Sequence, residues 1–417
     1  MSLSKHRSIP SYDFPEAILS EILKRLPVKY VLRCRAVQKS WYHLLRTSMF
    51  ISLHCNYHKM TAHVNPKYLI FNYGSPRRLY TVRSDDAQSQ EYCTFVYPLD
   101  LPPNAWSAQS NGLICVSTMF NEVLGYSPKI YIWNPLVQKF KIVPESPLPR
   151  FTFEETEWKA LAFGFLPEIN DYVVVHVVKP SSTSAPECDF EPYSTEDPYE
   201  QYPHSVMIVV YSLNTNSWKK ICQDKVFVDH MCTSKSVFVN GTAFWVGYNC
   251  DMQCQLVMFF DTKTNILGHV TVPSLAIRHF RQLDRPLILP YGQSIAYFVE
   301  GDVIDWDDYD YEDDDYGSPH LDVWVLKGEM INELSWEKKI CVRLSENVRA
   351  RVLGTRNNGE PILAKSNNLI SCDLNTLEPH DFVESYDRLT PHYHHKEGSR
   401  SPFVIHPFVE TLKLLDV

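Results

Sequence analysis

Cysteine and histidine are the first residues to consider for chemistry in this sequence. Cys250 and Cys254 form one close pair, and His230 lies upstream, but the compact cysteine pairs of a zinc module are absent. The eleven cysteines are odd in number and scattered from Cys34 to Cys372. This pattern is typical of free, mostly buried thiols in a reducing compartment. We therefore predict no metal site and no disulfide framework.

Other catalytic patterns are also weak. Asp307 and Asp308 are an acidic pair of the kind that glycosidases use, but they lie in a low-complexity run that cannot hold two carboxylates at a fixed separation. His392, His394 and His395 stand in a polar stretch that is more typical of a solvated loop than of a metal site or pH sensor. We find no nucleophile elbow and no glycine-rich phosphate loop. The sequence predicts no catalytic residue and no cofactor.

The acidic stretch around residue 310 allows two interpretations. Eight acidic residues and no basic one lie between Asp305 and Asp315, and a second acidic segment spans Glu187 to Glu200. One interpretation is a solvated insert. The other is an electrostatic arm that steers a basic protein onto the domain, with aromatic side chains adding contact area. On that second interpretation the target-binding residues are Asp305, Trp306, Asp307, Asp308, Tyr309, Asp310, Tyr311, Asp313, Asp314 and Asp315.

Composition limits the class of protein. The chain has 417 residues, 44% of them hydrophobic and 13% aromatic, with a formal net charge of −9. These values are typical of a globular protein and disfavour broad binding to nucleic acid or anionic lipid. Met1 to Asp13 lacks the apolar core of a secretory signal, and no apolar run has the length of a membrane helix. We expect a soluble protein of the cytoplasm or nucleus.

The first fifty residues predict helices. Asp13 and Glu16 form a pattern like a capping box, and Pro15 is tolerated in a first helical turn. Pro27 ends the helix. Its apolar residues recur at helical spacing: Phe14, Ile18, Leu19, Ile22, Leu23 and Leu26.

Two further short helices are expected, one carrying Val31 and Leu32 and one from Gln38 to Arg46. Three short helices cannot bury all of this apolar surface by themselves. The module is therefore either a cap that packs on the rest of the chain or an exposed docking surface for a partner protein. The residue pattern alone leaves these alternatives equal.

Residues 14–50 resemble a plant F-box. The matching positions are Pro15, Ile18, Ile22, Leu23, Leu26, Pro27, Val28, Lys29, Leu32, Arg33, Arg35, Val37, Lys39, Ser40, Trp41, Leu44, Leu45 and Phe50, with Phe14 where the family has leucine. This resemblance implies binding to a Skp-type adaptor and, through it, to a cullin–RING core. The adaptor-binding residues that it implies are Phe14, Pro15, Ile18, Ile22, Leu23, Leu26, Pro27, Leu32, Val37 and Trp41.

From Tyr68 onward the pattern changes to strands and turns. Six hairpins are predicted by β-branched and aromatic residues around polar turns: Tyr68–Val82, Ile130–Val143, Val209–Lys220, Leu256–Val272, Leu321–Val342 and Leu369–Val383. Asn-Gly turns precede three of them, at Asn111, Asn240 and Asn358. With two inserted loops removed, at 180–204 and 302–318, the hairpins recur at about 50 residues, the kelch-like period.

We therefore predict a small all-α module of three helices, residues 10–52, followed by an all-β domain, residues 66–417. The favoured architecture is a six-bladed kelch-like β-propeller, and the alternative is a pair of β-sandwiches. The strand-like tail from Phe403 to Leu415 is expected to pair with the first blade and close the ring.

The β domain resembles the plant F-box-associated domain. The matching segments are Ser110–Leu113, Trp133–Pro135, Phe163–Phe165, Asn170–Tyr172, Tyr211–Leu213, Asn216–Trp218, Val239–Gly241, Trp324–Leu326 and Val409–Leu412. The resemblance implies a non-catalytic substrate-recognition subunit of an SCF-type ubiquitin ligase, which captures a target protein for ubiquitination and degradation. Two alternatives stay open: a pollen S-locus F-box protein that recognises basic ribonucleases, and a propeller scaffold outside any ligase.

Overall fold

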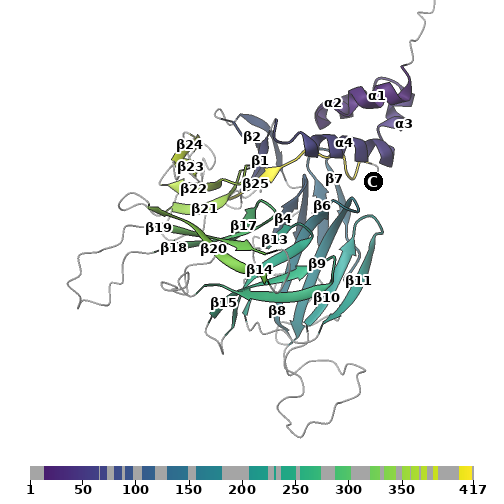
Figure 1. Ribbon diagram of the computed structural model, residues 1–417. Helices are drawn as coiled ribbons and strands as arrows, with labels where there is room; N and C mark the ends of the chain where they lie inside the picture. The colour runs from purple at the N-terminus through teal and green to yellow at the C-terminus, as the bar shows by residue number, and fades with distance from the viewer. Residues whose placement is uncertain are drawn as a thin grey trace, which may run out of the picture.

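The structure is a computed structural model. It describes residues 14–64, 66–72, 79–86, 90–96, 106–117, 129–148, 156–180, 206–223, 230–231, 236–249, 254–273, 287–301, 320–328, 333–343, 350–356, 358–365, 368–372, 379–383 and 403–415. Within these residues, helices α1–α4 come first and strands β1–β25 follow. Figure 1 shows the helices packed together at one end of the β domain.

Four helices form the amino-terminal module, one more than predicted. They are α1 (Glu16–Leu23), α2 (Val28–Cys34), α3 (Lys39–Leu44) and α4 (Ser48–Met60). Helix α4 is capped by the Thr47 hydroxyl, which accepts a hydrogen bond from the Phe50 amide at 3.2 Å. The prediction of three helices was wrong because the buried face of α4 includes His54 beside Phe50 and Ile51, which weakens its hydrophobic pattern.

The strands form five hydrogen-bonded sheets among the described residues. The largest runs, in spatial order, β24 (Pro379–Val383), β23 (Asn368–Cys372), β22 (Pro361–Lys365), β21 (Ala350–Thr355), β25 (Phe403–Phe408), β1 (Lys67–Asn72), β2 (Leu79–Ser84) and β3 (Glu91–Val96). The next sheet along the chain contains β4 (Trp106–Ser110), β5 (Leu113–Ser117), β6 (Ile130–Asn134) and β7 (Lys139–Ile142).

The remaining three sheets are also meanders of neighbouring strands. One contains β8 (Thr156–Leu166), β9 (Asp171–Pro180), β10 (Val206–Ser212) and β11 (Ser217–Gln223). The next contains β12 (His230–Met231), β13 (Val237–Val239), β14 (Thr242–Asn249), β15 (Cys254–Asp261) and β16 (Ile266–Thr271). The last contains β17 (Leu287–Tyr291), β18 (Ser294–Gly301), β19 (His320–Lys327) and β20 (Ser335–Arg343).

All six predicted hairpins are present, as the pairs β1–β2, β6–β7, β10–β11, β15–β16, β19–β20 and β23–β24. Successive antiparallel meanders are the blades of a β-propeller, which confirms the all-β prediction and excludes the sandwich alternative. The expectation of six separate blades was wrong. Four sheets have the size of a blade, and the fifth has eight strands because β25 joins the first and the last strand groups.

Strand β25 closes the ring as predicted. It pairs antiparallel with β1 over six residue pairs, from Lys67 opposite Phe408 to Asn72 opposite Phe403. On its other side it meets β21 in parallel, where Gly354 faces Ile405. A Cβ atom on Gly354 would overlap the Ile405 carbonyl, so only glycine permits this approach. Figure 1 shows β25, in yellow, beside β1, with the terminal segment running on towards α4.

Apolar cores lie between adjacent sheets. The interface of the β4–β7 and β8–β11 sheets buries Ile132, Phe163 and Tyr211, together with Leu414 from the carboxyl terminus. The helical module has its own core, which includes Leu45, Phe50, Leu412 and Leu415. The two ends of the chain therefore share one hydrophobic core.

Within the described part of the chain, no helix combines the length and the hydropathy needed to cross a membrane. The same residues contain no group of three histidine, cysteine or acidic side chains arranged to hold a metal ion. Six of the cysteines in the described part of the chain are free thiols: Cys34, Cys55, Cys93, Cys115, Cys254 and Cys372.

Candidate functional site

Helix α1 has two apolar faces. Leu19 and Leu23 point into the core of the helical module, where they are 9% and 2% exposed. Phe14, Ile18 and Ile22, four residues apart, lie in solvent with 61%, 49% and 49% of their surface exposed. Such a row of large exposed aliphatic and aromatic side chains on one helix face is typical of a protein-docking surface.

The ten predicted adaptor-binding residues divide into three groups. Phe14, Pro15, Ile18, Ile22 and Val37 are exposed. Leu26, Pro27, Leu32 and Trp41 are partly buried, and the three apolar chains other than proline pack on the core of the module. Leu23 is buried in that core, and its role as a docking anchor stays a prediction.

Three exposed apolar residues of the helices were not among the predicted docking residues. Tyr30 on α2 is 48% exposed, and Met49 and Met60 on α4 are 68% and 76% exposed. Tyr30 lies next to a matched segment of the F-box pattern, so its position was a usable signal. Met49 carried no such signal, because α4 itself was not predicted.

The helical module is rich in basic side chains. Residues 14–64 contain eight lysine and arginine residues and two glutamates, a formal net charge of +6, whereas the whole chain carries −9. Arg46 donates a hydrogen bond to the Tyr42 hydroxyl at 2.7 Å, and the Arg35 guanidinium lies 5.0 Å from the Tyr42 ring centre. The hydrogen bond from Arg46, followed by that from Arg35, lowers the pKa of Tyr42. The charge of the helical module is complementary to that of an acidic partner.

The turn between α1 and α2 is held from two sides. The Leu26 carbonyl accepts hydrogen bonds from Nε2 of His54 at 2.9 Å and Nε2 of His58 at 3.1 Å. The Val28 amide donates to Oε2 of Glu410 at 2.8 Å. The two imidazole rings of α4 lie 4.2 Å apart. The carboxyl-terminal segment and α4 therefore fix a turn that contains two of the predicted docking residues.

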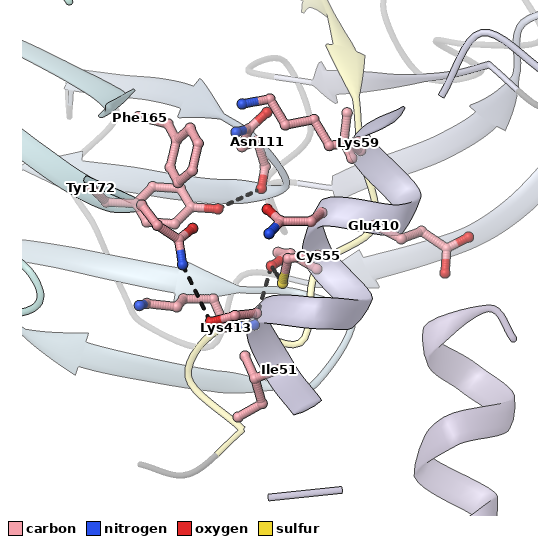
Figure 2. Close-up of a pocket in the computed structure, with 13 residues that line it drawn as sticks. Ile51, Cys55, Lys59, Asn111, Phe165, Tyr172, Glu410 and Lys413 are labelled. Atoms are coloured by element: carbon pink, nitrogen blue, oxygen red, sulfur yellow. Dashed lines mark hydrogen bonds between the residues drawn. The ribbon is translucent and has the colours of Figure 1, made fainter. Parts of the chain in front are cut away.

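A small pocket lies where α4 meets the propeller. Figure 2 shows Cys55 and Lys59 on α4 facing Tyr172 and Asn111 of the β domain. Tyr172 donates to the Asn111 carbonyl at 2.9 Å, and Asn170 donates to the Ser52 hydroxyl at 3.2 Å. The second of these hydrogen bonds crosses from the propeller to α4, so the pocket belongs to their junction.

The predicted target-binding residues Asp305–Asp315 lie outside the described residues, as do Glu187–Glu200, Cys250 and the histidines at 392, 394 and 395. The electrostatic arm therefore stays a prediction.

Two buried histidines should make the stability of the fold sensitive to acid. Burial lowers the pKa of His54 and of His176 to about 3, and the nearby charges of His58 and Lys159 act in the same direction. Both rings are therefore neutral in the fold, whereas the unfolded chain binds protons below a pKa of about 6.5. Their contribution to stability is complete above that pH and is lost as the pH falls towards 3.

When the pH is lowered from about 7.5 to about 5.5, the free energy of unfolding should fall by about 1.4 kcal/mol for each of the two histidines. Urea unfolding at the two pH values measures this loss. The variant His54→Gln, which keeps a neutral donor near the Leu26 carbonyl, should lose about half of the pH dependence. Equal stability at both pH values would contradict the assignment of neutral buried rings.

Family models match most of the chain. Residues 12–53 match the F-box domain, and residues 66–374 match the F-box associated beta propeller domain. The chain belongs to the F-box proteins with an associated β-propeller. The resemblance read from its sequence is thereby confirmed.

Known F-box proteins are similar along most of the chain. The F-box protein CPR1 of Arabidopsis thaliana is 24% identical over 395 residues, which cover 89% of this chain and 86% of that protein. The Arabidopsis thaliana F-box protein At1g70380 is 25% identical over 270 residues, 61% of this chain and 62% of its own length, so that match spans less than two thirds of the relative. A solved chain of the nidogen/laminin complex aligns with a TM-score of 0.41 and 8% identity over 83% of this chain and 98% of that chain.

Proposed function

We propose that this F-box protein is the substrate-recognition subunit of an SCF-type ubiquitin ligase. The observation that carries the proposal is the exposed row of Phe14, just before α1, with Ile18 and Ile22 on the outer face of that helix, in a module that matches the F-box family. On this proposal the chain contributes binding and the catalytic core supplies the chemistry. Its working place is the cytoplasm or the nucleus.

The partner of the helical module is a Skp-type adaptor. Its apolar groove covers the α1 row, with Val37 adding to the same contact. The net charge of +6 on residues 14–64 favours an adaptor with acidic residues around that groove, because complementary charge speeds association and selects against basic partners. The adaptor then links the F-box to a cullin–RING core.

The propeller binds the protein that is to be ubiquitinated. Loops at the ends of propeller blades vary freely while the sheets hold them in place, which suits target recognition. A scaffold without ligase activity remains the competing function. It would need no adaptor, so adaptor capture separates the two.

The double variant Ile18→Asp/Ile22→Asp tests the proposal. Full burial of an isoleucine side chain is worth about 1.5–3 kcal/mol, and an aspartate in an apolar groove adds a desolvation cost, so adaptor affinity should fall more than about 100-fold. Titration calorimetry with a purified Skp-type adaptor measures the loss.

The matched control is Ile169→Asp. Ile169 is 62% exposed on the β8–β9 turn, outside the helical module, and should leave adaptor binding unchanged. Thermal unfolding of both variants should match that of the unmodified chain, because the altered side chains already contact water. Failure of the unmodified chain to bind any Skp-type adaptor, or full binding by the double variant, would refute the proposal.

A further inference from the structure

The last described residues of the chain, 409–415, lie between the F-box and the propeller; we call them the terminal joint. Leu412 and Leu415 are 0% and 3% exposed in the F-box core, and Leu414 is 2% exposed in the core between two propeller sheets. Side chains close together in one short segment therefore pack into the cores of two different modules. Figure 1 shows this segment passing beside α4.

Polar contacts hold the terminal joint to the propeller. The Asn134 side-chain amide, at the end of β6, donates to the carbonyls of Thr411 at 2.9 Å and Lys413 at 2.8 Å. Gly112, with a φ of 79°, lets the β4–β5 turn approach so closely that a Cβ atom there would overlap the Val409 carbonyl. These contacts specify one backbone path for the joint.

A second set of contacts holds the joint to the F-box. The Thr411 hydroxyl lies 3.0 Å from the Cys55 thiol on α4, and burial raises the pKa of this thiol, which keeps it protonated. Figure 2 shows Cys55 on α4 beside the pocket at the junction, with the Glu410 carboxylate pointing away from Tyr172.

Glu410 connects both modules through one buried carboxylate. The residue is 3% exposed. Its Oε2 accepts from the Val28 amide at the start of α2, and its Oε1 lies 3.0 Å from the Lys67 ammonium at the start of β1. Val28 belongs to the F-box docking turn and Lys67 to the propeller. Rotation of the F-box relative to the propeller would break these contacts. An unpaired buried carboxylate or amide costs free energy, so the observed orientation is strongly preferred.

We propose that the terminal joint fixes the orientation of the F-box relative to the propeller, that Glu410 is its positioning residue, and that the choice of lysines accepting ubiquitin depends on this orientation. The last clause rests on the proposed ligase function. The adaptor and the catalytic core are carried by the F-box, while the target is carried by the propeller. The angle between the modules therefore decides which amines reach the ubiquitin thioester.

The first experiment measures orientation in the full chain. Spin labels introduced through unnatural amino acids at Glu16 on α1 and at Ile266 on β16, both exposed, report the distance between the modules. The unmodified chain should give one narrow distance distribution. Glu410→Ala and Lys67→Met should broaden it, and Glu410→Gln, which keeps an acceptor for the Val28 amide, should broaden it less.

The control is Glu337→Ala, which removes an exposed carboxylate that lies 3.3 Å from the Lys327 ammonium and 3.2 Å from the Lys339 ammonium, all within the β17–β20 sheet. It should leave the distribution narrow. Lys67→Met changes only the propeller side of the contact and keeps the test decisive if Glu410→Ala does not fold. An unchanged narrow distribution in Lys67→Met, and in Glu410→Ala if that variant folds, would overturn the proposal.

The second experiment uses the chain's own lysines as ubiquitin acceptors. In a complex with a Skp-type adaptor and a cullin–RING core, mass spectrometry should find ubiquitin on a restricted set of lysines. In Lys67→Met the yield at those sites should fall about ten-fold while other lysines become modified. The reason is that ubiquitin transfer slows when the acceptor amine is no longer aligned with the thioester. Adaptor affinity should stay unchanged.

An identical modification pattern in Lys67→Met would overturn the link to transfer. If the unmodified chain binds no adaptor, the ligase proposal fails, and the distance distributions still decide whether the joint is rigid.

Discussion

Removal of residues 403–417 is expected to prevent folding of both the propeller and the F-box. The deletion takes away β25, which pairs with β1 over six residues and meets β21. It also removes five buried apolar side chains: Ile405, Phe408, Leu412, Leu414 and Leu415. At about 1.5–3 kcal/mol each, their burial contributes about 7–15 kcal/mol, as much as the whole net stability of a typical domain.

The truncated chain should therefore form soluble aggregates or inclusion bodies, since strands β1 and β21 would both present unpaired edges. Size-exclusion chromatography with light scattering and far-ultraviolet circular dichroism measure the outcome. The control is deletion of residues 416–417 alone, which should leave a monodisperse protein. A monodisperse 403–417 deletion with the original melting temperature would contradict closure of the ring by β25.

Replacement of Leu26-Pro27 by Ala-Ala should abolish useful adaptor capture while the propeller stays folded. Leu26 packs on the F-box core, and its carbonyl receives both histidines of α4. Pro27 precedes α2 with a φ of −54°, close to the value that its ring imposes. Alanine at this position raises the conformational entropy of the unfolded chain and so destabilises the folded turn. Together the changes should weaken the docking turn by about 2–4 kcal/mol, about 30- to 1,000-fold in adaptor affinity.

Calorimetric titration of the adaptor measures this loss, and hydrogen exchange shows where the chain has loosened. Amides of α1 and α2 should exchange faster, whereas those of β8–β10 should not change. Val64→Ala, at a 62%-exposed site beyond α4, is the control and should bind normally. Undiminished capture by the Ala-Ala variant would show that the turn does not contribute to docking.

The β hairpins were predictable because their signal is local. Alternating β-branched and aromatic residues around a polar turn specify a hairpin without reference to the rest of the chain. The Asn-Gly turns are equally local: Asn111 and Gly112, with φ of 45° and 79°, occupy the left-handed region that these two residues tolerate best. The number of sheets could not be predicted from local signals. It depends on the pairing of β25 with β1, which lies more than 300 residues earlier in the chain.

The docking surface was predictable in position but not in detail. Helical spacing marks both Ile22 and Leu23 as apolar, and only the packing of α1 on the other helices decides that Ile22 faces solvent and Leu23 the core. Helix α4 was missed because its buried face uses His54, whose burial depends on a carbonyl contributed by another turn.

The sequence by itself therefore determined the family, the order of the modules and the local strands and turns, since each rests on residues close together in the chain. Only the tertiary structure decided how the modules are joined. The sequence places Glu410 in a segment that resembles the F-box-associated domain, but only the fold brings Val28 and Lys67 to its two oxygens. A carboxylate buried between groups 382 and 343 residues away leaves no periodic pattern, because such contacts arise from the path of the whole chain.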